Sequence, residues 1–197
     1  MSFEEIKQFI ADQFGEAVVV SEHQDALQPF LVLQTDKLAD VCLELHDNSQ
    51  TYFDFLACVT GLDNGPEAGT MEVIYNLNSI PYNHQLTLKV IVPRNAADAP
   101  MPTVPSVSHI WRTADWHERE VYDMVGVYFE NHPDMRRILC AADWEGHPLR
   151  KDYQLQDYYH GIKVPYDNHN ENHGFRGEPQ QVTGIPTSFS DKREKPG

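Results

Sequence analysis

Apolar side chains recur at helical spacing in the first fifteen residues and again after residue 35. Three or four residues separate successive apolar positions, which is the period of an amphipathic α-helix. We expect the first helix to end near Gly15, and Thr35 or Asp36 can cap the second. The apolar faces are Phe3, Ile6, Phe9, Ile10 and Phe14 in the first helix, and Leu38, Val41, Cys42 and Leu45 in the second.

Other stretches of the first 94 residues have the pattern of β-strands. They are short and rich in β-branched and aromatic residues, and in the last of them Leu86, Leu88 and Val90 alternate with other side chains. A turn that contains Pro81 separates the last two. Two helices and several strands with short connections predict an α+β domain with a mainly antiparallel sheet. The expected strands are 17–20, 30–34, 52–60, 71–77 and 85–92.

The chain divides by composition into four parts. The last part is rich in Asn, Gly, Pro and Gln and poor in large apolar residues. Such a segment cannot by itself bury enough surface to offset its ordering entropy, so we expect an extended, irregular tail that lies on partner proteins. In the tail, His169 and His173 are expected in a solvated loop. The parts are the α+β domain at 1–94, a Pro-rich linker at 95–105, a helix with a following segment at 106–157, and the tail at 158–197.

The helix expected over residues 106–125 places a carboxylate among apolar side chains. Ser106 can cap its start, and Gly126 can end it in a left-handed cap. Glu118 falls on the apolar stripe, where a charge is costly unless it is paired. We therefore expect Glu118 to pair with one of the arginines that follow. The stripe is Trp111, Ala114, Val121 and Val125, and charges of alternating sign at Asp115, Arg119 and Asp123 mark another face.

Charge and cysteine usage limit the possible functions. A net charge of −15 disfavours a nucleic-acid ligand. No apolar run is long enough for a membrane span, and the N-terminus lacks the apolar core of a signal peptide. Cys42, Cys58 and Cys140 are odd in number and widely spaced, so we expect three buried small hydrophobes without disulfides or cluster ligation.

Residues 116–153 gather charges, aromatic residues, Pro and Gly, and two interpretations compete. In one, His117, Glu118, Glu120 and Asp123 supply acid/base groups or metal ligands. In the other, the charges form a salt-bridge lattice that docks the helix, and we favour it because a His/Glu pair three residues apart is a weak metal signal. Pro133 and Pro148 stiffen turns, and Gly146 permits a positive φ. Ion pairs with carboxylates are expected, ahead of anion binding, for Arg136, Arg137, Arg150 and Lys151.

These residues resemble the signature of the C subunit of respiratory NADH-quinone oxidoreductase, the thirty-kilodalton subunit of complex I. The resemblance covers roughly residues 103–153. Val121 and Val125 depart from the usual pattern, which indicates a slightly different packing of the helix. Phe129, Ile138 and Leu139 carry part of the resemblance. The other residues that carry it are also the expected interface residues: Glu118, Arg119, Glu120, Tyr122, Asp123, Gly126, His132, Pro133, Arg137, Asp143, Trp144, Gly146, Pro148, Leu149, Arg150, Lys151, Asp152 and Tyr153.

The resemblance implies a scaffold protein without a catalytic residue or a cofactor of its own. Such subunits lie in the peripheral arm, beside the D subunit, which helps to form the quinone site and is here called the quinone-site subunit. FMN, iron–sulfur clusters and quinone belong to partner subunits of that complex, which passes electrons from NADH to quinone and translocates protons. The resemblance places the chain peripherally on the cytoplasmic side of the inner (plasma) membrane.

Two alternatives stay open. The first is the equivalent subunit of a membrane-bound hydrogenase or of a ferredoxin-dependent complex, because one subunit without cofactors does not identify the machine. The second, more remote, is a free-standing metal-dependent hydrolase that uses His117, Glu120 and Asp123.

Overall fold

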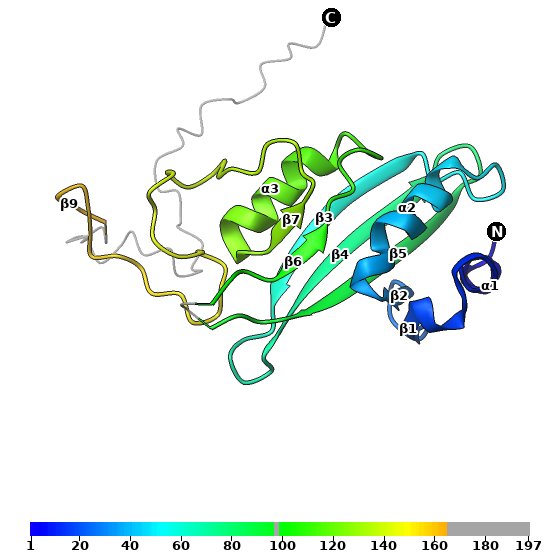
Figure 1. The fold of residues 1–197 in the computed structure, drawn as a ribbon, viewed down its shortest axis with the longest axis horizontal. Helices are drawn as coiled ribbons and strands as arrows, with labels where there is room; N and C mark the ends of the chain where they lie inside the picture. The colour runs from blue at the N-terminus through cyan, green and yellow to red at the C-terminus, as the bar shows by residue number, and fades with distance from the viewer. Residues whose placement is uncertain (97–98, 165–197) are drawn as a thin grey trace, which may run out of the picture. The chain divides into compact units, whose positions relative to one another are not determined.

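A five-stranded sheet organises the computed structural model, which describes residues 1–96 and 99–164 (Figure 1). The strands lie in the order β1-β2-β5-β4-β3, and every neighbouring pair is antiparallel except β2 and β5. The predicted α+β class with a mainly antiparallel sheet is therefore confirmed. The strands are β1 (Val19–His23), β2 (Phe30–Leu33), β3 (Phe55–Asp63), β4 (Thr70–Ser79) and β5 (His84–Pro93).

One face of the sheet is buried under helices. In β4 every second residue is buried, as a strand with one face on a core requires. Figure 1 shows α2 (Leu38–Asp47) and α3 (Ala114–Val125) over the same face. The buried residues of α1 (Phe3–Phe14), Ile6 and Ile10, join the same apolar core. Ser2 caps α1 in a capping box with Glu5, an N-terminal cap that the sequence prediction omitted.

Several predicted boundaries in the N-terminal part were wrong. Residues 16–18 form a 3₁₀ turn, so the first strand begins at Val19. Thr35–Lys37 is a second 3₁₀ turn, and neither Thr35 nor Asp36 caps α2. β3 begins at Phe55 and continues through Gly61 to Asp63, because its pairing with β4 continues to Asp63. α3 packs directly on Gly61, where a Cβ would lie 2.5 Å from Cγ1 of Val121. That glycine serves close packing and does not end the strand.

The helix expected over residues 106–125 is shorter than predicted, because α3 begins only at Ala114. Residues 106–107 are held in a non-helical conformation by three hydrogen bonds. The backbone N–H of Ser106 donates to the carbonyl of Glu130, and the Ser106 hydroxyl and the Val107 N–H both donate to Glu118. The expected linker contains β6 (Thr103–Pro105), which pairs in parallel with β7 (Tyr128–Glu130). Gly126 adopts the predicted left-handed conformation after α3, with φ of 81°.

Met1–Gln156 form one compact unit, and a second unit begins at Asp157. Between β7 and Gln156 the described chain contains neither helix nor strand. In the second unit, β8 (Tyr158–Tyr159) and β9 (Ile162–Lys163) form a short hairpin. The tail beyond residue 164, with His169 and His173, lies outside the described residues. Across 1–96 and 99–164, no helix has the length and apolar character that crossing a membrane requires.

Candidate functional site

Residues 132–153, here called the signature segment, are fastened to α3 through the buried carboxylate of Asp123. Its Oδ1 accepts a hydrogen bond from Nη1 of Arg137 at 2.9 Å. Its Oδ2 accepts the backbone N–H groups of three successive residues: Ile138 at 3.0 Å, Leu139 at 2.7 Å and Cys140 at 2.9 Å. Burial alone would raise the pKa of Asp123, but these donors outweigh it and hold the pKa below its usual value.

A second buried carboxylate, Asp63 at the end of β3, holds the other end of the signature segment. Asp63 accepts the backbone N–H of Lys151 at 2.8 Å and Nε of Arg94 at 2.8 Å. Arg94 also pairs with Asp152, so that one arginine joins the sheet to the segment. Burial raises the pKa of Asp63, and the N–H groups of Lys151 and Gly65 with Arg94 lower it by more.

Between these two anchors, the signature segment covers the C-terminal end of α3. Nε of Arg150 donates to the carbonyl of Val125 at 2.8 Å and Nη2 donates to that of Gly126 at 3.2 Å. Nδ1 of His147 lies 3.0 Å from the carbonyl oxygen of Asp123, and burial lowers the pKa of this imidazole. A Cβ at Gly126 would lie within 2.6 Å of both His147 and Arg150, so only glycine fits there.

Glu118 is fully buried on the apolar stripe as predicted, but its predicted arginine partner is wrong. Its carboxylate accepts the hydroxyl of Ser106 at 2.6 Å and the backbone N–H of Val107 at 2.8 Å. Burial raises the pKa of Glu118 to about 7 against these two hydrogen bonds. Glu118 therefore ties α3 to the turn after β6.

The alternating charges on α3 only partly pair as expected. Nη1 of Arg119 lies 3.9 Å from Asp115 and 3.8 Å from Asp134, and its guanidinium covers the ring of Trp116. Asp123 turns instead to Arg137. Two of the four cations predicted to form ion pairs do so: Arg136 with Asp134, and Arg137 with Asp123. Arg150 instead donates to neutral oxygens, and Lys151 contacts Asp63 through its backbone N–H.

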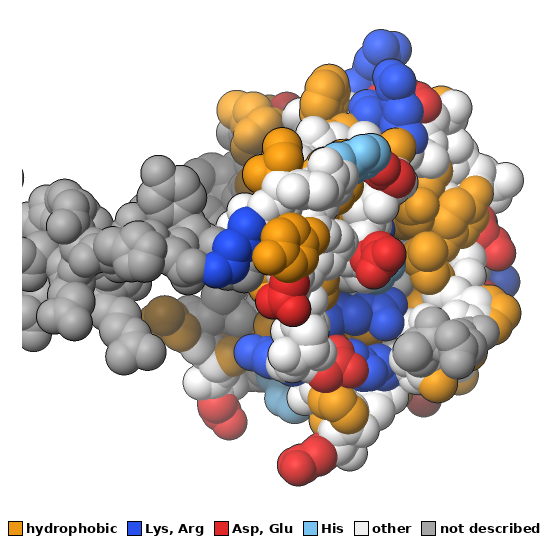
Figure 2. All heavy atoms as spheres, turned by 90° about the vertical axis from the view of Figure 1, so that its left-hand side faces the viewer, with side chains coloured by type: hydrophobic (Ala, Val, Ile, Leu, Met, Phe, Trp, Pro, Cys, Tyr) orange, Lys and Arg blue, Asp and Glu red, His pale blue; other side chains and the backbone are white. Residues whose placement is uncertain are grey.

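The remaining predicted residues surround these anchors. His132 accepts the N–H of Asp134 and lies 3.1 Å from the carbonyl oxygen of Asp115, while Nε1 of Trp144 donates to the hydroxyl of Tyr153. Gly146 has the predicted positive φ, and its carbonyl accepts Arg137. The Tyr122 ring contacts those of Tyr128 and His147. Figure 2 shows acidic and basic side chains interspersed with apolar ones at this end. Exposed or half-exposed positions are Glu120, Pro133, Asp143, Pro148, Leu149 and Lys151.

Only two of the three residues of the hydrolase alternative come together, because Asp123 is directed elsewhere. His117 and Glu120 line a pocket of about 210 Å³ between α3 and β3, whereas all the donors of Asp123 come from the signature segment. Within the described residues, no three His, Cys, Asp or Glu side chains gather as metal ligands. Cys42 is buried and burial raises its pKa, but Cys58 and Cys140 are only half-buried, contrary to expectation.

The sequence prediction missed Asp63, Arg94 and the acceptor role of Glu118 toward the 106–107 turn. The alternation of inward and outward positions along β3 could have identified Asp63. Val59, Gly61 and Asp63 alternate along the inward face of β3, so Asp63 is a carboxylate on a core position, as Glu118 is.

Comparisons with known proteins place this geometry in one family. The model of the respiratory-chain NADH dehydrogenase 30 Kd subunit matches residues 31–159. The chain is 45% identical to the NADH-quinone oxidoreductase C subunit of Chloroherpeton thalassium, over 80% of this chain but only 63% of that protein. It is 43% identical to the same subunit of Chlorobium phaeobacteroides, over 80% and 92% respectively.

A solved structure has a similar fold. It is a chain of the membrane-bound sulfane sulfur reductase, an archaeal respiratory membrane complex, with a TM-score of 0.62 and 25% sequence identity. The similarity covers 77% of this chain and 85% of that chain. With a family model that matches most of its length and relatives above 40% identity, the chain belongs to the family of the 30 kDa subunit of respiratory-chain NADH dehydrogenase.

Proposed function

We propose that the chain is a structural subunit in the peripheral arm of an NADH-quinone oxidoreductase, and that its signature segment and α3 form or brace the contact with the quinone-site subunit. The observation that carries this proposal is the use of the charged groups. Asp123, Asp63 and Glu118 are all buried and bonded within the chain, so they stabilise a shape. Catalysis needs acid/base groups that can reach a substrate.

The side chains that the segment leaves exposed suit a protein interface. Leu139 and Leu149 are about 60% exposed although their backbone N–H groups are bonded to Asp123 and Met124. Trp116 is equally exposed on α3, stacked by Arg119. Aromatic side chains and arginine are enriched at protein interfaces and among the residues that contribute most of the binding energy. The exposed leucines add apolar area to this surface.

In this proposal the chemistry belongs to the whole complex. FMN, iron–sulfur clusters and quinone are held by partner subunits, and electrons pass from NADH to quinone with proton translocation. In this proposal the chain serves only to position its partners, on the cytoplasmic side of the membrane, and residues 1–96 and 99–164 contain no helix that could cross that membrane.

The similarity to a chain of the sulfane sulfur reductase favours a second candidate, the equivalent subunit of a related respiratory membrane complex. The curated relatives above 40% identity favour the NADH-quinone complex over this second candidate. Partner chains that co-purify with the protein decide between them: flavin- and NADH-binding subunits support the first, and a hydrogenase-type or sulfur-reducing set supports the second.

The test of the structural role uses exposed positions, so that folding is preserved. The double variant Leu139→Asp/Leu149→Asp should fold like the wild type but be lost from the isolated complex, and NADH:quinone activity should fall in proportion to the complex that remains. Val20→Asp is the matched control, because Val20 is 62% exposed on β1, away from the segment. Full assembly with loss of quinone reduction would contradict a purely structural role. Arg119→Ala should likewise reduce assembly without changing the turnover of each assembled complex.

A further inference from the structure

The free edge of β3 runs along a narrow pocket beside α3. β3 is the last strand of the five-stranded sheet, and its one partner there is β4. Four successive residues of the strand, 58–61, line the pocket of about 210 Å³. Side chains of successive strand residues point to opposite faces of a sheet, so a pocket that all four line follows the backbone edge. This pocket and the edge of β3 are here called the edge groove.

The opposite wall of the edge groove is a stripe of α3. His117, Val121 and Met124 lie four and three residues apart, so they share one side of the helix. Nδ1 of His117 is buried and has no hydrogen-bond partner in the described part of the chain. Glu120, at the rim, is exposed and forms no ion pair within residues 1–96 and 99–164. The groove thus contains an unpartnered ring nitrogen and a carboxylate without a counter-charge.

The register of β3 and β4 shows which backbone groups face the edge groove. In an antiparallel pair, residues whose backbone groups bond the neighbouring strand alternate with residues whose groups point away from it. Asn64 donates its N–H to the carbonyl of Thr70, which continues the register of the pair. Val59 and Gly61 lie an odd number of positions before Asn64, so their N–H and C=O groups point away from β4. Among the described residues nothing bonds these groups, which leaves them available to an incoming strand.

The two edges of the sheet differ in their protection. β1, at the other edge, is five residues long and has a register shift after Val19, and Glu22 on it pairs with Lys7 of α1. β3 is nine residues long, and none of residues 55–62 is charged or proline. Natural edge strands are commonly short, bulged or charged, which prevents pairing with other chains. Residues 58–62 have none of these features, so this edge suits pairing with another chain.

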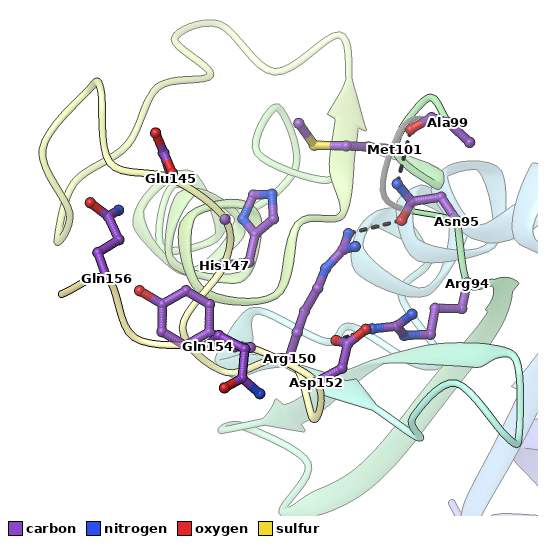
Figure 3. Close-up of a pocket in the computed structure, with 12 residues that line it drawn as sticks. Arg94, Asn95, Ala99, Met101, Glu145, His147, Arg150, Asp152, Gln154 and Gln156 are labelled. Atoms are coloured by element: carbon purple, nitrogen blue, oxygen red, sulfur yellow. Dashed lines mark hydrogen bonds and ion pairs between the residues drawn. The ribbon is translucent and has the colours of Figure 1, made fainter.

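A larger pocket, of about 520 Å³, lies between the residues after β5 and the signature segment (Figure 3). Its two arginines are bonded within the chain, Arg94 to Asp152 and Arg150 to Asn95, as the dashed lines in Figure 3 mark. These bonds join the signature segment to the sheet. The larger pocket therefore stabilises the fold, whereas the polar groups of the edge groove are left for a partner.

We propose that the edge groove receives an extended segment of a neighbouring subunit, which adds a strand to β3 and carries a Lys or Arg side chain that pairs with Glu120. Its backbone bonds the N–H and C=O groups of Val59 and Gly61, and side chains on one face of the added strand enter the groove, where a polar group bonds His117. The inference rests on the proposed function, because the partner belongs to the same complex.

Charge favours a basic segment of another protein over a second copy of this chain. The net charge of −15 attracts a basic segment and repels another copy. In addition, β3 contains no Lys or Arg, so a β3 edge paired with its own copy would leave Glu120 without a counter-charge.

Hydrogen exchange of single amides tests the added strand in the wild-type chain, measured alone and in the isolated complex by mass spectrometry with fragmentation. Alone, the amides of Val59 and Gly61 should exchange quickly, whereas that of Thr60, which is directed to β4, should exchange slowly. In the complex the first two should slow by about a hundredfold or more. The amide of Leu27, in the exposed turn between β1 and β2, is the control and should stay fast. Unchanged exchange at Val59 and Gly61 would overturn the inference.

Reversal of the rim charge gives an independent measurement. Glu120 is exposed, so Glu120→Lys should keep the melting temperature of the free chain, while its affinity for the rest of the complex falls by about tenfold or more. Glu16→Lys is the matched control, because it makes the same charge change at an exposed position after α1. Equal affinities of the two variants would also overturn the inference.

The outcomes separate this inference from the proposed function. If the wild-type chain assembles while the amides of Val59 and Gly61 stay fast, the edge receives no strand, although the structural role stands. If the free chain forms a dimer in which these amides are already slow, the edge belongs to a second copy and the inference is overturned. If the wild-type chain does not associate with the complex at all, both the inference and the proposed function are overturned.

Discussion

The sheet and the signature segment are held by opposite kinds of interaction. The buried apolar side chains of the described residues end at Phe129, and the largest of them, such as Tyr75 and Phe53, lie in or near the sheet. The signature segment adds only partly buried Met135 to that core. It is fixed instead by the buried carboxylates Asp123 and Asp63 and by Arg150. Core packing is spread over many contacts, whereas each polar anchor fixes several backbone groups at once, so single substitutions should release the segment and leave the sheet folded.

The largest effect should follow loss of the Asp123 anchor. Asp123→Asn leaves Arg137 without its counter-charge and presents an amide to N–H donors, which should cost about 3–5 kcal/mol. Because the affected bonds lie in the segment, amide hydrogen exchange at residues 138–140 should accelerate before exchange in β4 does. Asp134→Asn is the control, since Asp134 forms an exposed pair with Arg136. Equal acceleration in β4 would contradict the contrast between the two regions.

The pH dependence of stability should separate Glu118 from the aspartates. The pKa of Glu118 is about 7 in the folded state, against an ordinary value of 4.5. Between these two pH values the folded state binds the proton more tightly than the unfolded state, so the free energy of unfolding should fall as pH rises, by on the order of 3 kcal/mol in all. Asp63 and Asp123 have lowered pKa values, so their contribution is present above pH 3.8 and is lost as pH falls below it.

Glu118→Gln tests the first of these effects. The amide keeps an oxygen for the N–H of Val107 but does not titrate, so the slope of unfolding free energy between pH 4.5 and 7 should disappear. Urea unfolding at several pH values measures it. A slope that persists in the variant would assign the pH dependence to another group.

The sheet could be predicted from the sequence better than the contacts of the buried carboxylates could. Periodic burial is a local signal, so the strands of the sheet and the buried position of Glu118 could be predicted from spacing alone. The partner of Glu118 could not, because Ser106 and Val107 lie in a turn fixed by pairing with β7, a contact between three-residue strands that has no periodic signal. Asp63 could have been found from its inward position, but its pairing with Arg94 and Lys151 depends on a fold that brings distant segments together.

A smaller effect should arise where α3 meets the sheet. Gly61→Ala would place its Cβ 2.5 Å from Cγ1 of Val121, and such overpacking typically costs about 1–3 kcal/mol. Combining it with Val121→Ala removes the clashing atom, so the double variant should lose less stability than the sum of the two single variants. Thermal unfolding of the three proteins measures the coupling, and simple additivity would mean that α3 shifts freely on β3.

The smallest effect should have the opposite sign. Tyr75 is fully buried in the apolar core of the sheet, and its hydroxyl has no hydrogen-bond partner among the described residues. Burying an unpaired hydroxyl is unfavourable, so Tyr75→Phe should stabilise the fold by about 1 kcal/mol. Tyr82→Phe is the matched control, because its hydroxyl donates to the carbonyl of Ser49 at 2.7 Å and its loss should be neutral or slightly destabilising. Buried polar groups of the signature segment are anchors, so their removal should always destabilise. If Tyr75→Phe lost stability, the Tyr75 hydroxyl would be a polar anchor, and the sheet would also depend on such an anchor.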